Sequence, residues 1–254
     1  MGGDCFKMPR FFVRKNDVSC DSINISGEDY NHIKKVLRLG NGDRIIACDG
    51  EGTDHLVEIV KIEDAMVKTR IIESVKNCTE PPIQITLFQG LPKSDKMDFI
   101  IQKAVELGIN EIIPVITERT VVKTDRKSGD KKCERWNKIS MEAAKQCNRG
   151  IIPKVGFPLG FREALDAAKG SSLSLIPYEK EAGTKLKQVL ANSSSVGKVS
   201  VFIGPEGGFT EKEIEAAVSC GVQPVTLGPR ILRTETAGIA VLSILMYELG
   251  DVGT

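Results

Sequence analysis

The first 75 residues predict a small domain made mainly of strands. Short apolar runs lie between Gly-Asp and Asp-Gly turns, a spacing typical of a small β-barrel. The predicted strands are 11–13, 44–48, 56–62 and 66–72. One helix is expected among them: Ser26 can cap its N-terminus, and Ile33, Val36 and Leu37 give it an apolar face that ends near Gly40.

The segment 76–82 interrupts these patterns. Its double proline, Pro81-Pro82, fits neither a helix interior nor a central strand. We therefore expect a linker at 76–82, which separates a domain of residues 1–75 from a second domain of residues 83–254.

From Ile83 onward, strand-like and helix-like patterns alternate. The predicted strands are 83–89, 111–117, 173–178, 199–203 and 225–227, and the predicted helices are 97–107, 133–147, 185–191, 211–220 and 235–249. The fourth of these helices begins with a capping box, in which Thr210 and Glu213 bond each other's backbone amides. Alternation of this kind predicts an α/β domain with a mostly parallel sheet and helices on both faces.

Composition excludes several classes of protein. The chain has 254 residues, of which 41% are hydrophobic and 27% charged, as expected for a globular protein. It contains neither an apolar run long enough to span a membrane nor a signal peptide, so we expect a cytoplasmic protein without a membrane partner. Seven cysteines without a C-x-x-C pair and two isolated histidines favour neither disulfides nor a metal site.

Positive charge is concentrated in one segment. Residues 119–154 contain eleven Lys or Arg and four Asp or Glu, a local net charge of 11 − 4 = +7, although the whole chain carries only +1. Such a segment attracts phosphate, as in RNA. A solvated helical face remains the alternative explanation, because no aromatic residues are interleaved with these charges.

Two glycine-bearing turns offer the best indication of function. The first, G-P-E-G-G at 204–208, follows a predicted strand and uses three glycines where a tight connection needs one. The second, 227–237, follows another strand and places Arg230 and Arg233 beside a helix N-terminus, for which Thr234 is the expected cap. Two cations oppose the helix dipole there, which suggests that they meet an anion. Ligands bind where the carboxyl ends of parallel strands meet, although purely structural turns remain an alternative.

Common catalytic motifs are absent from the sequence. It contains no G-x-x-x-x-G-K-[ST] phosphate loop, no G-x-G-x-x-G dinucleotide pattern and no G-x-S-x-G elbow. Kinase, hydrolase and nicotinamide-dependent oxidoreductase functions are therefore disfavoured.

The two turns, G-P-E-G-G-F at 204–209 and L-G-P-R-I-L-R-T-E-T-A at 227–237, closely resemble the signature of the SPOUT superfamily, specifically of RsmE-type methyltransferases of small-subunit ribosomal RNA. The resemblance extends to M-P-R-F-F at 8–12, H-I-K-K-V-L-R-L at 32–39 and E-A-A-K-Q-C-N-R at 142–149. It implies a PUA-like β-barrel followed by an α/β domain with a trefoil knot, and a homodimer. The implied reaction is methyl transfer from S-adenosylmethionine to N3 of one uridine in 16S ribosomal RNA, free or in the small ribosomal subunit.

The resemblance also implies roles for individual residues. The cofactor-binding residues would be Leu175, Ile176, Pro177, Ile203, Gly204, Pro205, Glu206, Gly207, Gly208, Leu227, Gly228, Ile231, Leu232, Thr236 and Ala237. For catalysis we expect Arg233 first and Arg230 second to stabilise the charge that develops on uracil, with Glu206 orienting groups or accepting a proton. The residues expected to bind RNA are Arg10, Arg14, Lys35, Arg38, Arg119, Lys123, Arg126 and Arg149. Structural ion pairs are the alternative for the catalytic candidates, and a non-catalytic RNA-binding protein is the alternative for the whole chain.

Overall fold

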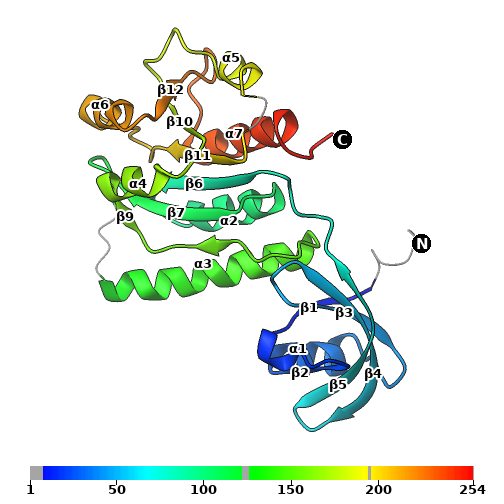
Figure 1. Cartoon of the computed structure of the whole chain (residues 1–254). Coiled ribbons are helices and arrows are strands. Elements are labelled where there is room, and N and C mark those ends of the chain that lie inside the picture. The colour runs from blue at the N-terminus through cyan, green and yellow to red at the C-terminus, as the bar shows by residue number, and fades with distance from the viewer. Residues whose placement is uncertain (1–7, 122–125, 194–195, 254) are drawn as a thin grey trace. The chain divides into compact units, whose positions relative to one another are not determined.

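The computed structural model describes residues 8–121, 126–193 and 196–253, with the side chains of 126–128 left out of the description. The described chain forms two compact units (Figure 1). The first contains the residues up to Glu80 together with Ala144–Ile152, and the second contains Pro81–Ala143 and the residues from Pro153 onward. The pattern along the sequence gives no sign that Ala144–Ile152 returns to the first unit.

The first unit is built on a five-stranded sheet in the order β1-β3-β4-β5-β2. Its strands are β1 (Arg10–Phe12), β2 (Ser22–Ser26), β3 (Arg44–Cys48), β4 (Thr53–Glu63) and β5 (Met66–Lys76). The helical segment consists of α1 (Glu28–Asn31) and a π-helical turn, His32–Val36. Buried isoleucine and valine side chains from these elements, among them Ile23, Ile33 and Val57, form the core.

The predicted helix cap at Ser26 is wrong. Ser26 is the last residue of β2, where it pairs with Met66 of β5, and Gly27 precedes α1 instead with a φ of 70°. The alternation of buried Ile23 and Ile25 marks β2 as a strand with one face in the core. That strand is absent from the sequence-based prediction.

The second unit is an α/β domain whose described strands all pair in parallel, which confirms the predicted fold class. The strand order is β12-β10-β11-β6-β7-β8, with β9 also beside β7. The strands are β6 (Gln84–Gly90), β7 (Glu111–Ile116), β8 (Lys154–Val155), β9 (Leu159–Gly160), β10 (Leu173–Pro177), β11 (Lys198–Ile203) and β12 (Gln223–Val225). The helices are α2 (Lys96–Glu106), α3 (Arg126–Gln146, whose last residues belong to the first unit), α4 (Phe161–Ala168), α5 (Leu186–Ala191), α6 (Glu211–Ser219) and α7 (Thr234–Glu248). The short elements α4, β8 and β9 lie outside the predicted set.

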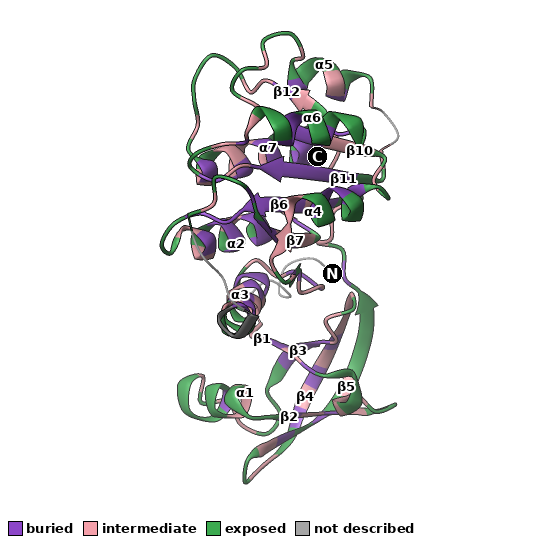
Figure 2. Cartoon of the chain, turned by 90° about the vertical axis from the view of Figure 1, so that its left-hand side faces the viewer, coloured by how far each residue is buried: buried purple, intermediate pink, exposed green. Residues whose placement is uncertain are grey.

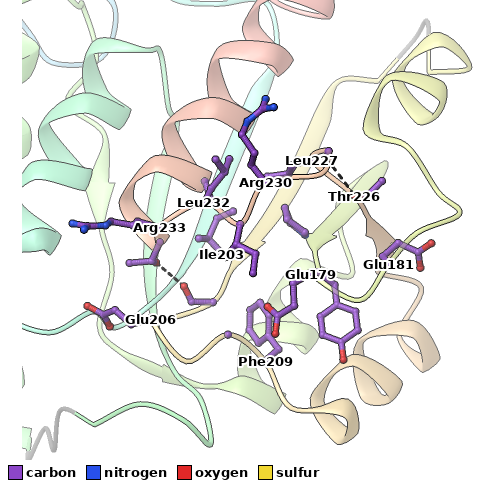
Figure 3. Close-up of a pocket in the computed structure, with 18 of the residues that line it drawn as sticks. Glu179, Glu181, Ile203, Glu206, Phe209, Thr226, Leu227, Arg230, Leu232 and Arg233 are labelled. Atoms are coloured by element: carbon purple, nitrogen blue, oxygen red, sulfur yellow. Dashed lines mark hydrogen bonds between the residues drawn. The ribbon is translucent and has the colours of Figure 1, made fainter.

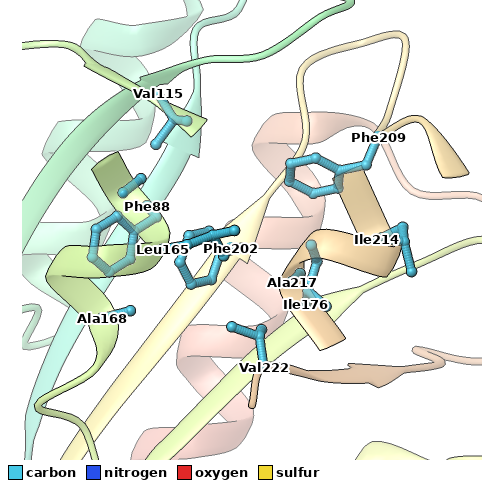
Figure 4. Packing of buried hydrophobic residues seen from close by; sticks show 11 residues of the cluster. Phe88, Val115, Leu165, Ala168, Ile176, Phe202, Phe209, Ile214, Ala217 and Val222 are labelled. Atoms are coloured by element: carbon cyan, nitrogen blue, oxygen red, sulfur yellow. The ribbon is translucent and has the colours of Figure 1, made fainter. Parts of the chain in front are cut away.

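Helices cover both faces of the parallel sheet. On one face, Phe88 of β6 and Phe202 of β11 are paired in register, and their rings stack 4.5 Å apart beneath α4 and α6 (Figure 4). On the other face, α2 packs against α7, and α7 contacts β11. The central strands β6 and β11 are consequently buried on both sides (Figure 2).

Local capping signals are confirmed at two helices. Gly108 follows α2 with a φ of 89°, as expected of a glycine that ends a helix. At α6, the Thr210 hydroxyl accepts a hydrogen bond from the Glu213 amide, while the Thr210 amide donates to the Glu213 carboxylate. The first glycine-bearing turn is therefore fixed to the helix that follows it.

Among the described residues, no helix has both the length and the apolar character needed to cross a bilayer. The six cysteines in this part of the chain are free, and no group of three potential metal-ligating side chains occurs there.

Candidate functional site

The two glycine-bearing turns meet at a cavity of about 730 Å³ (Figure 3). It lies where β10, β11 and β12 end, so the loops that follow these three neighbouring parallel strands meet at one place. The first turn supplies Gly204, Pro205, Glu206 and Gly208, and the second supplies 227–234 with Ala237. A cavity of this size is within the range of small-molecule sites.

Thr234 joins the two walls of this cavity. Its hydroxyl donates a hydrogen bond of 2.6 Å to the carbonyl of Gly204 and accepts one of 2.9 Å from Nε2 of Gln89, a fully buried residue. Thr234 is thus the first residue of α7, and the prediction that it caps this helix is wrong. Arg233 holds the N-cap position, and its side chain forms no capping hydrogen bond. The threonine hydroxyl serves tertiary structure because the Gly204 carbonyl lies within its reach.

Internal packing explains why each of the three positions in the first turn is a glycine. A Cβ on Gly204 would lie 3.0 Å from Cα of Gly208, and one on Gly207 would lie 3.2 Å from Cβ of Arg119. Gly208 has a φ of 66°, and a Cβ there would lie 3.0 Å from Oε2 of Glu179. Close approach of the chain to itself therefore explains these glycines without any contact to a ligand.

Gly90 offers a direct test of how strictly the first turn must be placed. A Cβ on Gly90 would lie 2.6 Å from both N and Cδ of Pro205, so Gly90→Ala must displace the turn. We expect the affinity for S-adenosylmethionine, the cofactor that the sequence resemblance implies, to fall at least about tenfold when it is measured by calorimetry. Gly170→Ala is the matched control, because a Cβ on Gly170 meets nothing within 4 Å. Equal affinities for the two variants would show that the cavity tolerates a moved turn.

The carboxylate of Glu206 is held at the edge of the cavity. It forms a salt bridge of 3.1 Å with Lys96, which also pairs with Glu235 at 3.3 Å, and it accepts the Lys93 amide at 3.1 Å. Burial by itself raises the pKa of Glu206, but hydrogen bonds from its own amide, from Lys96 and from the Lys93 amide outweigh burial and lower it. A carboxylate held in this way is a weak proton acceptor, and its contacts instead fix the turn to the start of α2.

Arg230 and Arg233 both line the cavity and are both exposed. Figure 3 shows their guanidinium groups at the edge of the cavity, directed away from its centre. Neither forms a salt bridge with the residues that the structure describes. Both are therefore available to an anion from outside the chain.

Most of the predicted cofactor-binding residues border the cavity. Those that do are Pro177, Ile203, Gly204, Pro205, Glu206, Gly208, Leu227, Gly228, Ile231, Leu232 and Ala237. Leu175 and Ile176 are buried in the sheet, Gly207 packs on Arg119, and Thr236 is exposed on α7, so these four lie outside the cavity wall. Further lining residues that the sequence-based prediction omits include Tyr178, Glu179, Glu181, Lys185, Phe209 and Thr226.

The predicted RNA-binding residues divide into two groups. Arg14, Lys35, Arg38 and Arg119 are exposed. Arg149 is buried and Arg10 is half-buried, and both form internal salt bridges, with Glu80 and Asp54 respectively, which favours a structural role for them over RNA binding. Lys123 and the side chain of Arg126 lie outside the described residues.

Comparisons with known proteins match most of the chain to RNA methyltransferases. Residues 79–246 match the family model of an RNA methyltransferase domain, and residues 25–67 match that of an RNA methyltransferase PUA domain. The chain is 37% identical to ribosomal RNA small subunit methyltransferase E of Bacillus subtilis, over 95% of this chain and 97% of the relative. It is 36% identical to the protein of that name from Mesomycoplasma hyopneumoniae, over 93% and 98%.

Solved structures give the same result. A ribosomal RNA small subunit methyltransferase E from Neisseria gonorrhoeae, bound to S-adenosylmethionine, matches with a TM-score of 0.86 and 35% identity over 96% of this chain and 99% of the other. A methyltransferase from Legionella pneumophila with the same cofactor matches with a TM-score of 0.86 and 32% identity over 97% and 100%.

Proposed function

The chain belongs to the ribosomal RNA small subunit methyltransferase E family, and we propose that it transfers the methyl group of S-adenosylmethionine to N3 of one uridine in 16S ribosomal RNA. The observation that carries the proposal is the single cavity formed by both glycine-bearing turns at the ends of three parallel strands.

The residues around the cavity fit S-adenosylmethionine. The carboxylate of Glu181 borders the cavity and suits a ligand with a sulfonium and an ammonium group. The apolar side chain of Ile231, 88% exposed at the cavity, offers a surface that a purine ring would cover. When bound, the cofactor supplies an already activated methyl group, so the protein must chiefly align that group with N3 and assist the loss of the N3 proton.

Arg233 is our first candidate for stabilising the negative charge that develops on the uracil oxygens, and Arg230 is the second. Both are exposed cations at the cavity without a salt bridge to the described residues, whereas the third candidate, Glu206, is held by Lys96. We assign Glu206 to positioning the turn.

RNA would be held by exposed cations of both units, namely Arg14, Lys35, Arg38 and Arg119. These contacts position the RNA backbone and carry no base specificity. Because N3 is hidden in a base pair, the target uridine must be unpaired or flipped out of a helix.

We also propose that the protein acts as a homodimer through α7. Its outward-facing positions Ala240, Ile244 and Tyr247 follow helical spacing, and the side chains of Ile244 and Tyr247 are 39% and 67% exposed. The knotted path of the second unit remains a prediction from the family resemblance, and the cytoplasmic location remains a prediction from the sequence.

Ile244→Glu is expected to raise the dimer dissociation constant at least about tenfold, because it buries a charge in an apolar contact. Sedimentation velocity over a dilution series measures this constant, and Lys212→Glu, an exposed change on α6, serves as the control for added negative charge. If the wild-type chain is itself monomeric, the dimer proposal is wrong.

The function is tested by mass spectrometry of 16S RNA nucleosides from cells that lack the protein. We expect 3-methyluridine to disappear and to return when the gene is restored. Unchanged 3-methyluridine would remove the substrate assignment. Calorimetry separates the alternatives: a non-catalytic RNA-binding protein would bind no S-adenosylmethionine, and an oxidoreductase would bind a nicotinamide dinucleotide instead.

A further inference from the structure

A second hollow adjoins the cofactor cavity. It encloses about 370 Å³ and shares Tyr178, Glu179 and Phe209 with the larger cavity. Its remaining wall comes from Glu118 and Arg119 after β7, from Lys180, and from the start of α6. The shared residues therefore lie at the boundary between the two spaces.

Glu179 differs from the other carboxylates that line the larger cavity. Glu206 is held by Lys96, and Glu181 accepts the amides of Gly183 and Thr184 at 2.8 Å each. Glu179 forms no hydrogen bond or ion pair with any residue in the described part of the chain. Figure 3 shows its carboxylate directed toward Phe209, at the side of the cavity opposite Arg230. It is the carboxylate that remains available to a ligand.

The first glycine-bearing turn is shaped around this carboxylate. Oε2 of Glu179 lies 3.0 Å from the place where a Cβ on Gly208 would stand, so a side chain at position 208 would displace it. On the neighbouring residue, the Gly207 carbonyl accepts a hydrogen bond of 2.6 Å from Nη1 of Arg119. Glu179 and Arg119 thus contact adjacent residues of the turn, Glu179 at the shared boundary and Arg119 in the second hollow.

The lining of the second hollow suits a nucleotide. The half-buried ring of Tyr178 offers aromatic surface to a base, and Arg119, Lys180 and Lys212 offer positive charge to its phosphates. Lys180 pairs with Glu211 at 2.6 Å in an exposed salt bridge, which a phosphate can displace at small cost. Among the expected RNA-binding residues with described side chains, Arg119 is the one that lines this hollow.

Building on the proposed function, we propose that the target uracil enters through the second hollow, that its N3 edge reaches the boundary with the cofactor cavity, and that Glu179 accepts the proton of N3 during methyl transfer. A neutral N3–H is a poor nucleophile, so the proton must leave as the new bond forms. N3 gives its proton to the Glu179 carboxylate and forms a bond to the methyl carbon. The carbon–sulfur bond breaks, and its electron pair stays on sulfur. The products are 3-methyluridine, S-adenosylhomocysteine and a protonated Glu179, which then releases its proton to water.

The test is Glu179→Gln, which keeps the shape of the side chain and removes its capacity to take the proton. We expect kcat to fall about 10²–10⁴-fold while the affinity for S-adenosylmethionine, measured by calorimetry, stays within about threefold. The remaining rate should rise about tenfold per pH unit toward the ionisation of N3, because hydroxide then removes the proton. RNA carrying 5-fluorouridine, whose N3 is more acidic, should partly restore the rate. Glu215→Gln, an exposed change on α6 outside both hollows, is the matched control.

Three results would overturn the proposal. They are an unchanged kcat, a weakened affinity for S-adenosylmethionine with kcat retained, and an equal loss in Glu179→Asp, which keeps a carboxylate. The second result would mean that Glu179 holds a cationic group of the cofactor, and the proposed function would stand. Failure of the wild-type protein to form 3-methyluridine would instead reject the proposed function itself.

Discussion

Replacing Arg233 with alanine should lower the rate of methyl transfer about 10²–10³-fold and leave the affinity for S-adenosylmethionine within about threefold. Loss of the N3 proton spreads negative charge over O2 and O4 of uracil, so a guanidinium beside these oxygens stabilises the transition state more than the ground state. Arg233 lines the cavity and is exposed at the start of α7. Single-turnover rates with 16S RNA and calorimetry with the cofactor measure the two quantities separately.

Two further variants identify the origin of the effect. Arg233→Lys keeps the charge but not the planar donor geometry, and it should recover part of the rate. Arg162→Ala removes an exposed arginine of α4 that lines neither hollow, and it should behave as wild type. An equal loss of rate and affinity would make Arg233 a cofactor-binding residue, and no loss at all would transfer the role to Arg230.

Replacing Glu80 with alanine should destabilise the first unit by about 3–5 kcal/mol. The carboxylate of Glu80 pairs at 2.5 Å with Arg149, whose side chain is only 5% exposed. It also accepts the amides of Gly150 and Ile151, at 3.0 and 3.1 Å. Alanine would leave a buried charge and two backbone donors without this acceptor, and the segment Ala144–Ile152 would lose its attachment to Glu80.

Hydrogen exchange can localise this loss. A change of about 3–5 kcal/mol corresponds to exchange faster by a factor of about 10²–10³ or more at the amides of this segment. Glu58→Ala is the control, because it removes an exposed pair with Arg70 in the same unit and should cost less than about 1 kcal/mol. Protection that is equal in both variants would show that Arg149 finds sufficient partners elsewhere.

Local patterns predicted the parts of the fold that short-range physics specifies. The apolar face of α2 and its glycine stop were correct, and so was the Thr210–Glu213 capping box, because each depends on residues within one or two turns of each other. The mostly parallel sheet also followed from the alternation of strands and helices.

Predictions failed where a distant partner decides the outcome. Thr234 has a side chain typical of a helix cap, but its hydroxyl instead donates a hydrogen bond to the Gly204 carbonyl, 30 positions away. Ser26 suits a cap equally well, yet pairing with Met66 makes it part of a strand. Arg149 lies in a basic segment typical of RNA contacts, and only the fold brings it to Glu80.

At the candidate site, too, local patterns identified some residues, and others could be found only from the fold. The two turns stood out because glycine and arginine are unusual at the start of a helix, and both border the cavity. Glu179 carries no such signal, since a single glutamate after a strand fits any surface loop. Its position two residues beyond Pro177, at the end of a strand already expected to contribute a cofactor loop, was the one available indication.

The hydroxyl of Thr234 also has a consequence for the order of events during protein synthesis. This hydroxyl accepts a hydrogen bond from Gln89 and donates one to the carbonyl of Gly204. Gln89 and Thr234 are 145 positions apart in the chain. A ribosome therefore synthesises β6 and β11 before the residues that complete the cavity. The cofactor can stabilise only a chain whose α7 is already in place, so its binding acts at the end of translation and cannot support the early folding of the nascent protein.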